Sequence, residues 1–226
     1  MTAILQAPPR GPQRPARANG RVPPPPPPTG GDGDPDRDPA RRRPLLDNAV
    51  LATIFVIGGE LMLFAGLVFS FWIVRLAAPI WPPLLQPRLP VGVTAANTIV
   101  LLASSGAIVA ATRARAQGRR RAFVRGLAVA ASLGTLFLAI QGYEWFRLIG
   151  FGLTVTSGSY GTTFYTLIGA HAAHLVAALA WLGVTLTLAA RGRFAGPRAA
   201  AVTACAMYWH FVVALWPILY VSVYLL

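Results

Sequence analysis

The sequence predicts an all-α, polytopic membrane protein, in which a bundle of five transmembrane helices follows a disordered, proline-rich N-terminal arm. Composition gives the first indication: 55% of the residues are hydrophobic and 12% are charged, against about 25% charged residues in a soluble domain. The apolar runs give the second, because five of them approach or exceed the ~20 residues that cross the core of a bilayer. A soluble domain of 226 residues would not contain so many.

The net charge of +13 would suit a nucleic-acid-binding protein if the basic residues formed one surface. All 20 basic residues are arginines, however, and they lie in the N-terminal tail and between the apolar runs. That distribution is typical of membrane topology, so we predict no nucleic-acid partner. The one cysteine, Cys205, lies inside an apolar run, which excludes an internal disulfide and a thiolate metal cluster.

Residues 1–43 form the predicted arm, a Pro/Arg-rich cytoplasmic segment that includes six consecutive prolines at 23–28. Such a sequence buries too little apolar surface to offset the entropy of ordering, so we expect disorder with some polyproline-II character. It lacks the apolar stretch of a signal peptide, and the first helix must therefore insert by itself. The arm could dock on a neighbouring subunit, but a solvated extension is the favoured interpretation. Residues 44–226 form the membrane domain.

The five predicted spans are separated by connections with very different arginine contents. We place the spans at Asp47–Leu76, Val91–Thr112, Ala122–Arg147, Tyr160–Ala190 and Ala199–Leu226. Arginines cluster before the first span, between the second and third, and between the fourth and fifth: Arg41, Arg42, Arg43, Arg113, Arg115, Arg119, Arg120, Arg121, Arg125, Arg191, Arg193 and Arg198. The other connections hold only Arg75, Arg88 and Arg147. The positive-inside rule therefore puts the N-terminus in the cytoplasm and the C-terminus outside.

Glu60 is the first candidate functional residue, because a carboxyl group at membrane depth is costly and usually faces protein, headgroups or water. It lies thirteen residues into the first predicted span, or ~20 Å of helix rise, near mid-membrane. Gly58, Gly59 and Gly66 flank it and would let a neighbouring helix approach closely. Two interpretations stay open: a proton-linked or lipid-linked carboxyl, or a protonated side chain that only bonds between helices.

The remaining polar residues at membrane depth favour structural roles. Gln141 and Arg147 flank Glu144 on one helix face, and a Glu144–Arg147 pair at the helix end is favoured over catalysis. His171, His174 and His210 could bind a haem or a metal, but no further ligand set lies near in sequence, so hydrogen-bonding core histidines are favoured. The hydroxyl and amide side chains of the second span indicate bonds between helices: Asn97, Thr98, Ser104 and Ser105.

No phosphate-binding loop, dinucleotide fingerprint or nucleophile motif is present. By themselves the residues therefore indicate a membrane bundle for which we predict no catalytic residue and no metal ligand. The connection FGLTVTSGSYG is polar only through hydroxyls and glycine, so it could fold back onto the bundle.

Each predicted span carries a segment that resembles a motif of one known family. GGELMLFAGLVFSFW is similar to S-S-E-x-M-F-F and places Glu60 on the family's glutamate, and NTIVLLASSG is similar to L-N-T-x-x-L-L-x-S-S-G. LGTLFLAIQGYEW resembles L-G-x-x-F-x-x-x-Q-x-x-E-Y, which places Gln141 and Glu144. SGSYGTTFYTLIGAHAAHL resembles D-G-x-Y-G-S-x-F-F-x-x-T-G-x-H-G-x-H-V, which places His171 and His174, and YWHFVVALWPILYVSVYLL resembles W-H-F-V-D-x-V-W-L-x-L-Y. The family is cytochrome c oxidase subunit III of the haem–copper oxidases, and the resemblance covers roughly residues 48–226.

This sequence departs from the family pattern at three places. The family's first two helices are absent, as in the five-helix forms of many bacterial oxidases. Val213 stands where the closing motif has an aspartate, so any role of that carboxyl is lost. Ser157 and Ala172 replace the aspartate of the external turn and the second glycine of H-G-x-H.

The resemblance implies the non-catalytic core subunit III of a bacterial haem–copper respiratory terminal oxidase, a cytochrome c oxidase that reduces O2 to water and pumps protons. It implies partner subunits I and II, which carry the haem and copper, and a cofactor-free chain that binds phospholipid in a cleft and supports oxygen and proton access. A small subunit IV or a respiratory supercomplex partner is a further expected contact. The location would be the bacterial cytoplasmic (inner) membrane. Glu60 would face the large subunit or the lipid cleft, with His171, His174 and His210 bracing the bundle.

Three alternatives stay open. A quinol oxidase or a nitric oxide reductase could contain such a subunit, because the electron donor is read by other chains. A stand-alone proton-linked transporter would predict an internal repeat and interrupted helices, and neither is visible. A b-type haem protein would use His174 and His210 as ligands and would show a Soret band.

Overall fold

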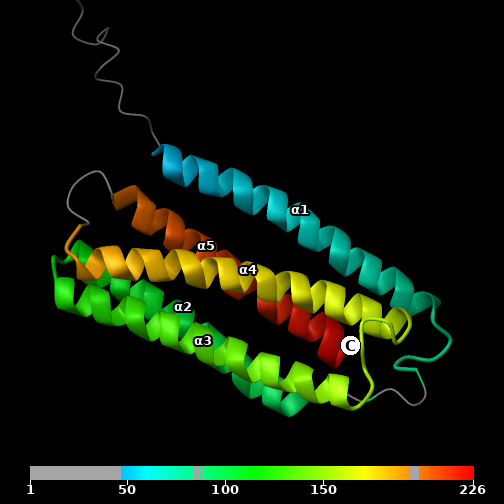
Figure 1. The fold of residues 1–226 in the computed structure, drawn as a ribbon. Coiled ribbons are helices and arrows are strands. Elements are labelled where there is room, and N and C mark those ends of the chain that lie inside the picture. The colour runs from blue at the N-terminus through cyan, green and yellow to red at the C-terminus, as the bar shows by residue number, and fades with distance from the viewer. Residues whose placement is uncertain (1–46, 84–86, 88, 194–198) are drawn as a thin grey trace, which may run out of the picture. The chain divides into compact units, whose positions relative to one another are not determined.

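Five long helices make up the fold of the chain, in a computed structural model that describes residues 47–83, 87, 89–193 and 199–226. All described residues belong to one unit, Pro44–Leu226. The helices are α1 (Asn48–Ala77), α2 (Val91–Ala116), α3 (Arg120–Gly150), α4 (Ser159–Ala190) and α5 (Ala199–Tyr220), and α5 continues into a π-helical turn, η4 (Val221–Leu225) (Figure 1). Each is long and apolar enough to cross a membrane. The predicted five-span, all-α architecture is confirmed; the predicted arm, residues 1–43, lies outside the described residues.

The helices extend further than the sequence predicts where they leave the apolar runs. α2 continues four residues beyond Thr112, and α3 begins two residues before Ala122 and ends three after Arg147. Arginine is a good helix former, so a charged residue ends the apolar run without ending the helix. The ends of α2, α3 and α4 are instead set by a glycine with positive φ: Gly118, Gly152 and Gly192. At each end the next residue's N–H bonds back to the helix, as in Arg119 N–H to the Ala114 carbonyl at 2.9 Å.

α2 and α3 form a tight antiparallel pair (Figure 1). Gly126 of α3 lies against Ala111 of α2, and a Cβ atom at Gly126 would lie 2.7 Å from the Ala111 Cβ. Small residues at a crossing let two backbones approach, which is how helices associate when lipid offers no hydrophobic driving force.

α5 is the most buried helix, in contact with α1, α2 and α4. Its two large indoles face α2: Trp209 Nε1 donates to Ser104 Oγ at 3.2 Å, and Trp216 Nε1 donates to Thr98 Oγ1 at 2.9 Å. Farther along, the Tyr220 hydroxyl donates to the Val91 carbonyl at 3.1 Å. The partners on α2 descend as the donors on α5 ascend, so the two helices run antiparallel, joined by the hydroxyl groups that the sequence predicts as interhelical partners.

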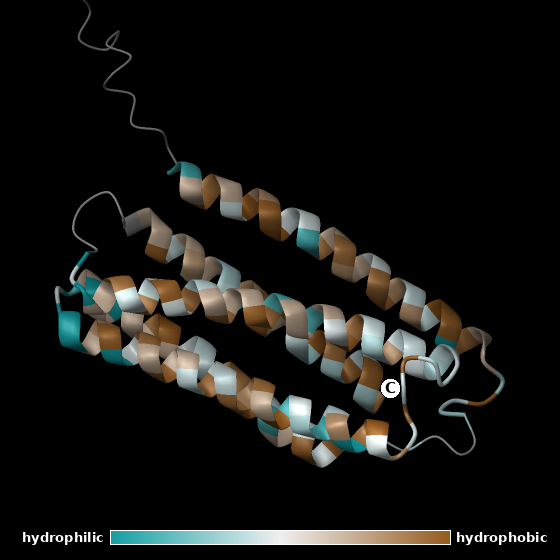
Figure 2. Ribbon diagram, in the orientation of Figure 1, coloured by the Kyte–Doolittle hydropathy of each residue, from teal (hydrophilic) through white to brown (hydrophobic). Residues whose placement is uncertain are grey.

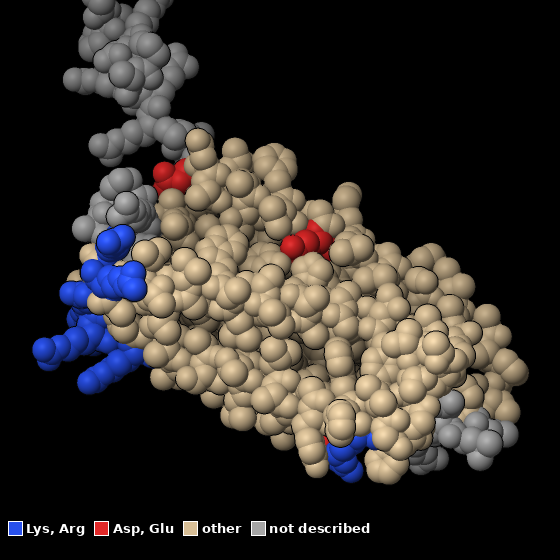
Figure 3. Space-filling model, in the orientation of Figure 1, with Lys and Arg blue, Asp and Glu red and all other residues tan. Residues whose placement is uncertain are grey.

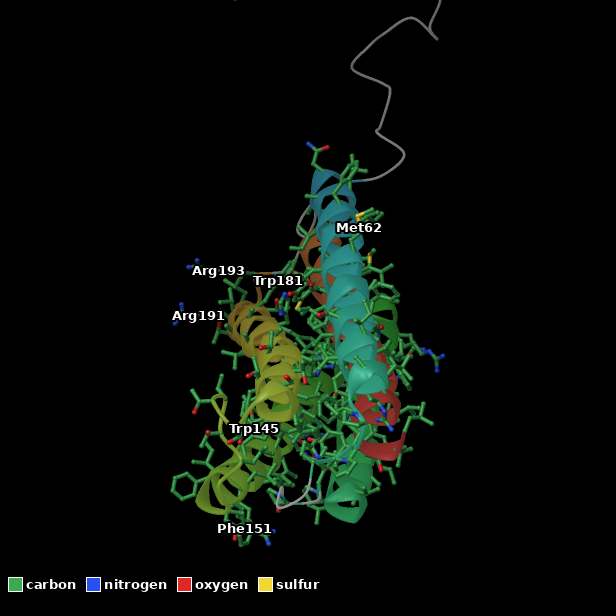
Figure 4. All side chains as sticks on the ribbon, turned by 90° about the vertical axis from the view of Figure 1, so that its right-hand side faces the viewer. Met62, Trp145, Phe151, Trp181, Arg191 and Arg193 are labelled. Atoms are coloured by element: carbon green, nitrogen blue, oxygen red, sulfur yellow. The ribbon has the colours of Figure 1, made fainter. Side chains whose placement is uncertain are left out.

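α1 packs on α4 and α5 through a narrow stripe of buried residues, Thr53, Phe64 and Phe71. The rest of its surface is apolar and exposed, as the brown ribbon of Figure 2 shows. Met62, which is 79% exposed, points away from the bundle in Figure 4. Such a helix would be unstable in water and suits lipid or a partner helix.

The connection between α3 and α4 folds back onto the bundle. Leu153 is fully buried, and its carbonyl accepts a hydrogen bond from the Tyr165 hydroxyl at 2.8 Å. Thr162 Oγ1 donates to the Val155 carbonyl at 2.6 Å, which ties the connection to the first turn of α4.

Candidate functional site

Glu60 lies at the junction of α1, α4 and α5, on the side of α1 that carries the buried stripe. Its Oε1 accepts a hydrogen bond from the Tyr208 hydroxyl of α5 at 3.0 Å. His174 Nε2 of α4 lies 3.8 Å from the same oxygen. The side chains of Glu60 and His174 are 18% and 22% exposed, so the group is largely enclosed by protein. We call Glu60, His174 and Tyr208 the Glu60 cluster.

The hydrogen bonds of the Glu60 cluster define where a proton can be held. His174 Nδ1 lies 2.7 Å from the Ala170 carbonyl, which only accepts, so Nδ1 carries a hydrogen. In the neutral ring Nε2 is then a bare acceptor, and it repels an ionised Glu60. A hydrogen bond between Nε2 and Oε1 would need a hydrogen on one of these two atoms. The arrangement brings side chains of α4 and α5 to one carboxyl oxygen of α1.

Glu60 has one further free position. Its second oxygen, Oε2, is buried and has no hydrogen-bond partner among the described residues. Phe64, one turn along α1, presents its ring at a steep angle to His174, with centroids 5.0 Å apart. The apolar ring covers the imidazole and limits the access of water to the cluster.

His171 lies one turn from His174 but has different surroundings. It is 1% exposed, and neither ring nitrogen has a hydrogen-bond partner among the described residues. Its ring packs on the Trp216 indole, with centroids 5.0 Å apart. An unpaired polar ring at this depth costs free energy, which the packing of the ring on Trp216 offsets in part.

His210 faces α2, away from the Glu60 cluster. Its Nδ1 makes a short hydrogen bond with Ser105 Oγ. His174 and His210 therefore have separate protein partners on different helices. Among the residues that the structure describes, no three His, Cys, Asp or Glu side chains are grouped to hold a metal ion.

The last three turns of α3 carry the remaining predicted polar residues, Gln141, Glu144 and Arg147. Arg147 Nη1 lies 3.1 and 3.2 Å from the two carboxylate oxygens of Glu144, the local pair that the sequence predicts. The Glu144 side chain is 7% exposed and the Arg147 side chain is 46% exposed, so a buried carboxylate is paired with a guanidinium group at the surface. Gln141 Nε2 donates to the Tyr224 hydroxyl at 3.1 Å, which joins α3 to the last turn of the chain.

The family model for cytochrome c oxidase subunit III matches residues 47–226, the whole described bundle. The chain belongs to the cytochrome c oxidase subunit III family. It is 33% identical over 177 residues to cytochrome c oxidase subunit 3 of Equus caballus. The aligned stretch covers 76% of this chain and 66% of that protein. The protein of Sus scrofa is 32% identical with the same coverage, and that of Formosania lacustris is 33% identical, with 67% of its length covered. The chain thus spans about two thirds of the length of these relatives.

The subunit III motifs fall on the structure in a consistent way. Val213, where the closing motif quoted in the sequence analysis has an aspartate, is 2% exposed and lies in the core. A buried carboxyl at that position would need a partner, and valine removes that requirement. Glu60 and His174 come together across α1 and α4, whereas His171 packs on Trp216.

Tyr208 is the site residue that sequence reasoning missed. Its place in an aromatic segment of α5 suggests only packing or a membrane interface. It nevertheless donates to Glu60 across 148 positions of the chain. The signal in the sequence is that Tyr208 and His210 are the polar residues beside Trp209 in a helix that is otherwise largely apolar. The sequence does not show that Tyr208 faces α1 and His210 faces α2.

Proposed function

We propose that this chain is the non-catalytic core subunit III of a bacterial haem–copper terminal oxidase, a cytochrome c oxidase that reduces O2 to water and pumps protons. One observation carries the proposal: the match to the family extends over all five helices, including those that form the Glu60 cluster. The subunit stabilises the catalytic subunit, binds phospholipid and supports oxygen and proton access, while haem and copper are held by its partners.

The apolar exposed surface of the bundle supports such an assembly. α1 leaves large side chains uncovered along its length, among them Phe55, Met62 and Phe69, which are 73%, 79% and 68% exposed. In a membrane these groups contact lipid or the helices of subunits I and II. A small subunit IV or a respiratory supercomplex partner would add to this surface. The complex lies in the bacterial inner membrane, with the N-terminus cytoplasmic.

Within this subunit, Glu60 is the proton-linked or lipid-linked group. The contacts of Oε1 with Tyr208 and His174 favour a proton held inside the bundle, and the buried Oε2, which has no partner among the described residues, can carry that proton. The other polar residues have structural roles: Gln141 and His210 join helices by hydrogen bonds, Glu144 and Arg147 pair at the end of α3, and His171 packs its ring on Trp216.

Purification through a tag on this chain in mild detergent tests the assembly. A reduced-minus-oxidised spectrum with haem bands, together with subunits I and II in the mass spectrum of co-eluting proteins, would support it. Co-elution of a copper-bearing second subunit would identify cytochrome c as the electron donor. A large haem subunit without that second subunit would indicate a quinol oxidase or a nitric oxide reductase. A colourless chain eluting alone would contradict the proposal and favour the transporter. A Soret band in the chain alone would indicate the b-type haem protein.

The Glu60→Gln variant tests the role of the carboxyl group. Glutamine keeps the shape and the acceptor for Tyr208 but cannot release a proton. We expect the variant to assemble with its partners and to lose activity sooner during continuous turnover. Glu144→Gln is the matched control, because it removes the other buried carboxyl of the bundle. Wild-type turnover kinetics for Glu60→Gln would overturn the role, and loss of assembly would make Glu60 a structural residue.

A further inference from the structure

Basic side chains crowd one end of the bundle, around the turn between α2 and α3. Blue atoms gather there in Figure 3, and Arg191 and Arg193 project outward from the end of α4 in Figure 4. At the start of α3 an open depression of about 620 Å³ is lined by Arg119, Arg120, Arg121, Ala122 and Arg125. We call this group the α3 arginine depression.

The arginines of the depression are largely uncompensated. No carboxylate of the described residues forms an ion pair with Arg119, Arg121 or Arg125. Arg120 is engaged, because its Nη2 donates to the Ala190 carbonyl at the end of α4 at 2.7 Å. The first turn of α3 also contains no acidic residue. Three guanidinium groups thus lie beside the N-terminus of a helix, which is itself partly positive. A bound anion would reduce the repulsion among these positive charges.

An apolar strip leads away from the depression along α3. Val129 and Leu136 lie four and eleven residues after Arg125, on the same helix face, and are 49% and 48% exposed, with the exposed Ser132 between them. The strip extends ~16 Å from Arg125 into the apolar part of the helix. A ligand that fits both features carries a phosphate at one end and a long hydrocarbon chain at the other.

We propose that the α3 arginine depression binds the headgroup of an anionic phospholipid, whose acyl chain lies on the Val129–Leu136 strip. Arg119, Arg121 and Arg125 contact the phosphate, and Arg120 fixes the start of α3 to the end of α4. The inference rests on the phospholipid binding included in the proposed function and assigns it a site and a headgroup charge. It needs the membrane location of the bundle but not assembly into an oxidase, so the lipid titration can fail while assembly holds, and the reverse.

The test is native mass spectrometry of the full chain with the subunits that co-purify, titrated with phosphatidylglycerol or with phosphatidylcholine of the same chains. Each arginine near an anionic headgroup contributes about fivefold in affinity. We expect phosphatidylglycerol to bind more tightly, and Arg121→Gln/Arg125→Gln to reduce that preference roughly 25-fold. The double variant Arg113→Gln/Arg191→Gln removes the same charge at the same end, outside the depression, and should retain the preference.

Three outcomes would overturn the inference. Equal losses in the two double variants would indicate a general charge effect. Equal binding of the two lipids to the wild-type chain would show that the depression does not select anions. Full displacement of phosphatidylglycerol by millimolar inorganic phosphate would assign the depression to a soluble phosphate ligand.

Discussion

Gly134 shows how closely a single residue can be fitted in this bundle. A Cβ atom at this position would lie 2.5 Å from Cη2 of Trp209 and 3.1 Å from Cδ2 of Leu179. The two contacts come from α5 and α4, so one missing methyl group allows three helices to meet.

Replacing Gly134 by alanine should therefore destabilise the protein. Overpacking of a filled core costs about 1–3 kcal/mol, which exceeds the roughly 0.5–1 kcal/mol that alanine gains over glycine within a helix. The measurement is thermal unfolding in detergent, followed by the fluorescence of the buried indoles. Gly142→Ala is the control on the same helix, because no described atom outside its own neighbours lies within 4 Å; it should leave stability unchanged or raise it. Equal effects at both positions would contradict the packing argument.

The hydroxyl of Tyr208 gives a second prediction at the scale of one residue. Tyr208→Phe keeps the ring that packs on Trp181 at 5.6 Å but removes the hydrogen bond to Glu60. Glu60 then loses the donor that holds Oε1 in place. We expect the Tyr208→Phe protein to assemble normally and to inactivate during turnover in the same direction as Glu60→Gln. Turnover indistinguishable from wild type in Tyr208→Phe, beside a clear effect of Glu60→Gln, would remove Tyr208 from the functional group.

At the scale of the elements, the helices were predictable but their neighbours were not. In lipid both faces of a helix are apolar, so hydrophobic periodicity, which identifies the buried face of a soluble helix, is nearly absent. Only polar residues mark the inner face, as Thr94, Asn97 and Ser104 do on α2. Glu60 could likewise be singled out because a carboxyl group is rare at this depth. Its partner on α5 depends on the pairing of α1 with α5, which no local pattern encodes.

The hydrogen bond between Trp216 of α5 and Thr98 of α2 should contribute modestly to the pairing of these helices. A double-mutant cycle with Trp216→Phe and Thr98→Val should give a coupling free energy of about 0.6 kcal/mol, with an upper limit near 1.7 kcal/mol. Thr185→Val replaces Thr98→Val in the control cycle, because Thr185 bonds within α4 to the Trp181 carbonyl. That cycle should be additive within about 0.5 kcal/mol. Additivity in both cycles would show that this hydrogen bond contributes nothing to the pairing of α2 with α5.

At the scale of the whole described bundle, polar and charged groups divide the molecule by depth. The described arginine-rich turns lie at the α2–α3 and α4–α5 ends, and the Glu144–Arg147 pair lies near the opposite end of α3. Between them, on the face that Figure 3 draws, no basic side chain is visible and acidic atoms appear at mid-bundle, while brown, hydrophobic residues predominate along the helices in Figure 2. Connections that are rich in arginine stay on the cytoplasmic side when a membrane protein inserts. In that orientation the α3 arginine depression would lie against the headgroups of the cytoplasmic leaflet.

Cysteine labelling decides this orientation. The lone cysteine, Cys205, is free and buried, so Cys205→Ala gives a background without reactive thiols. Gln117→Cys places an exposed thiol in the α2–α3 turn, and Thr156→Cys places one in the α3–α4 connection. A membrane-impermeant maleimide applied to intact cells should label Thr156→Cys and should label Gln117→Cys only after permeabilisation, because moving the arginine-rich turn across the membrane is unfavourable. Labelling of both variants after denaturation is the control for expression. The reverse pattern would place the arginine-rich end outside, where neither the positive-inside rule nor a cytoplasmic anionic lipid could explain its charge.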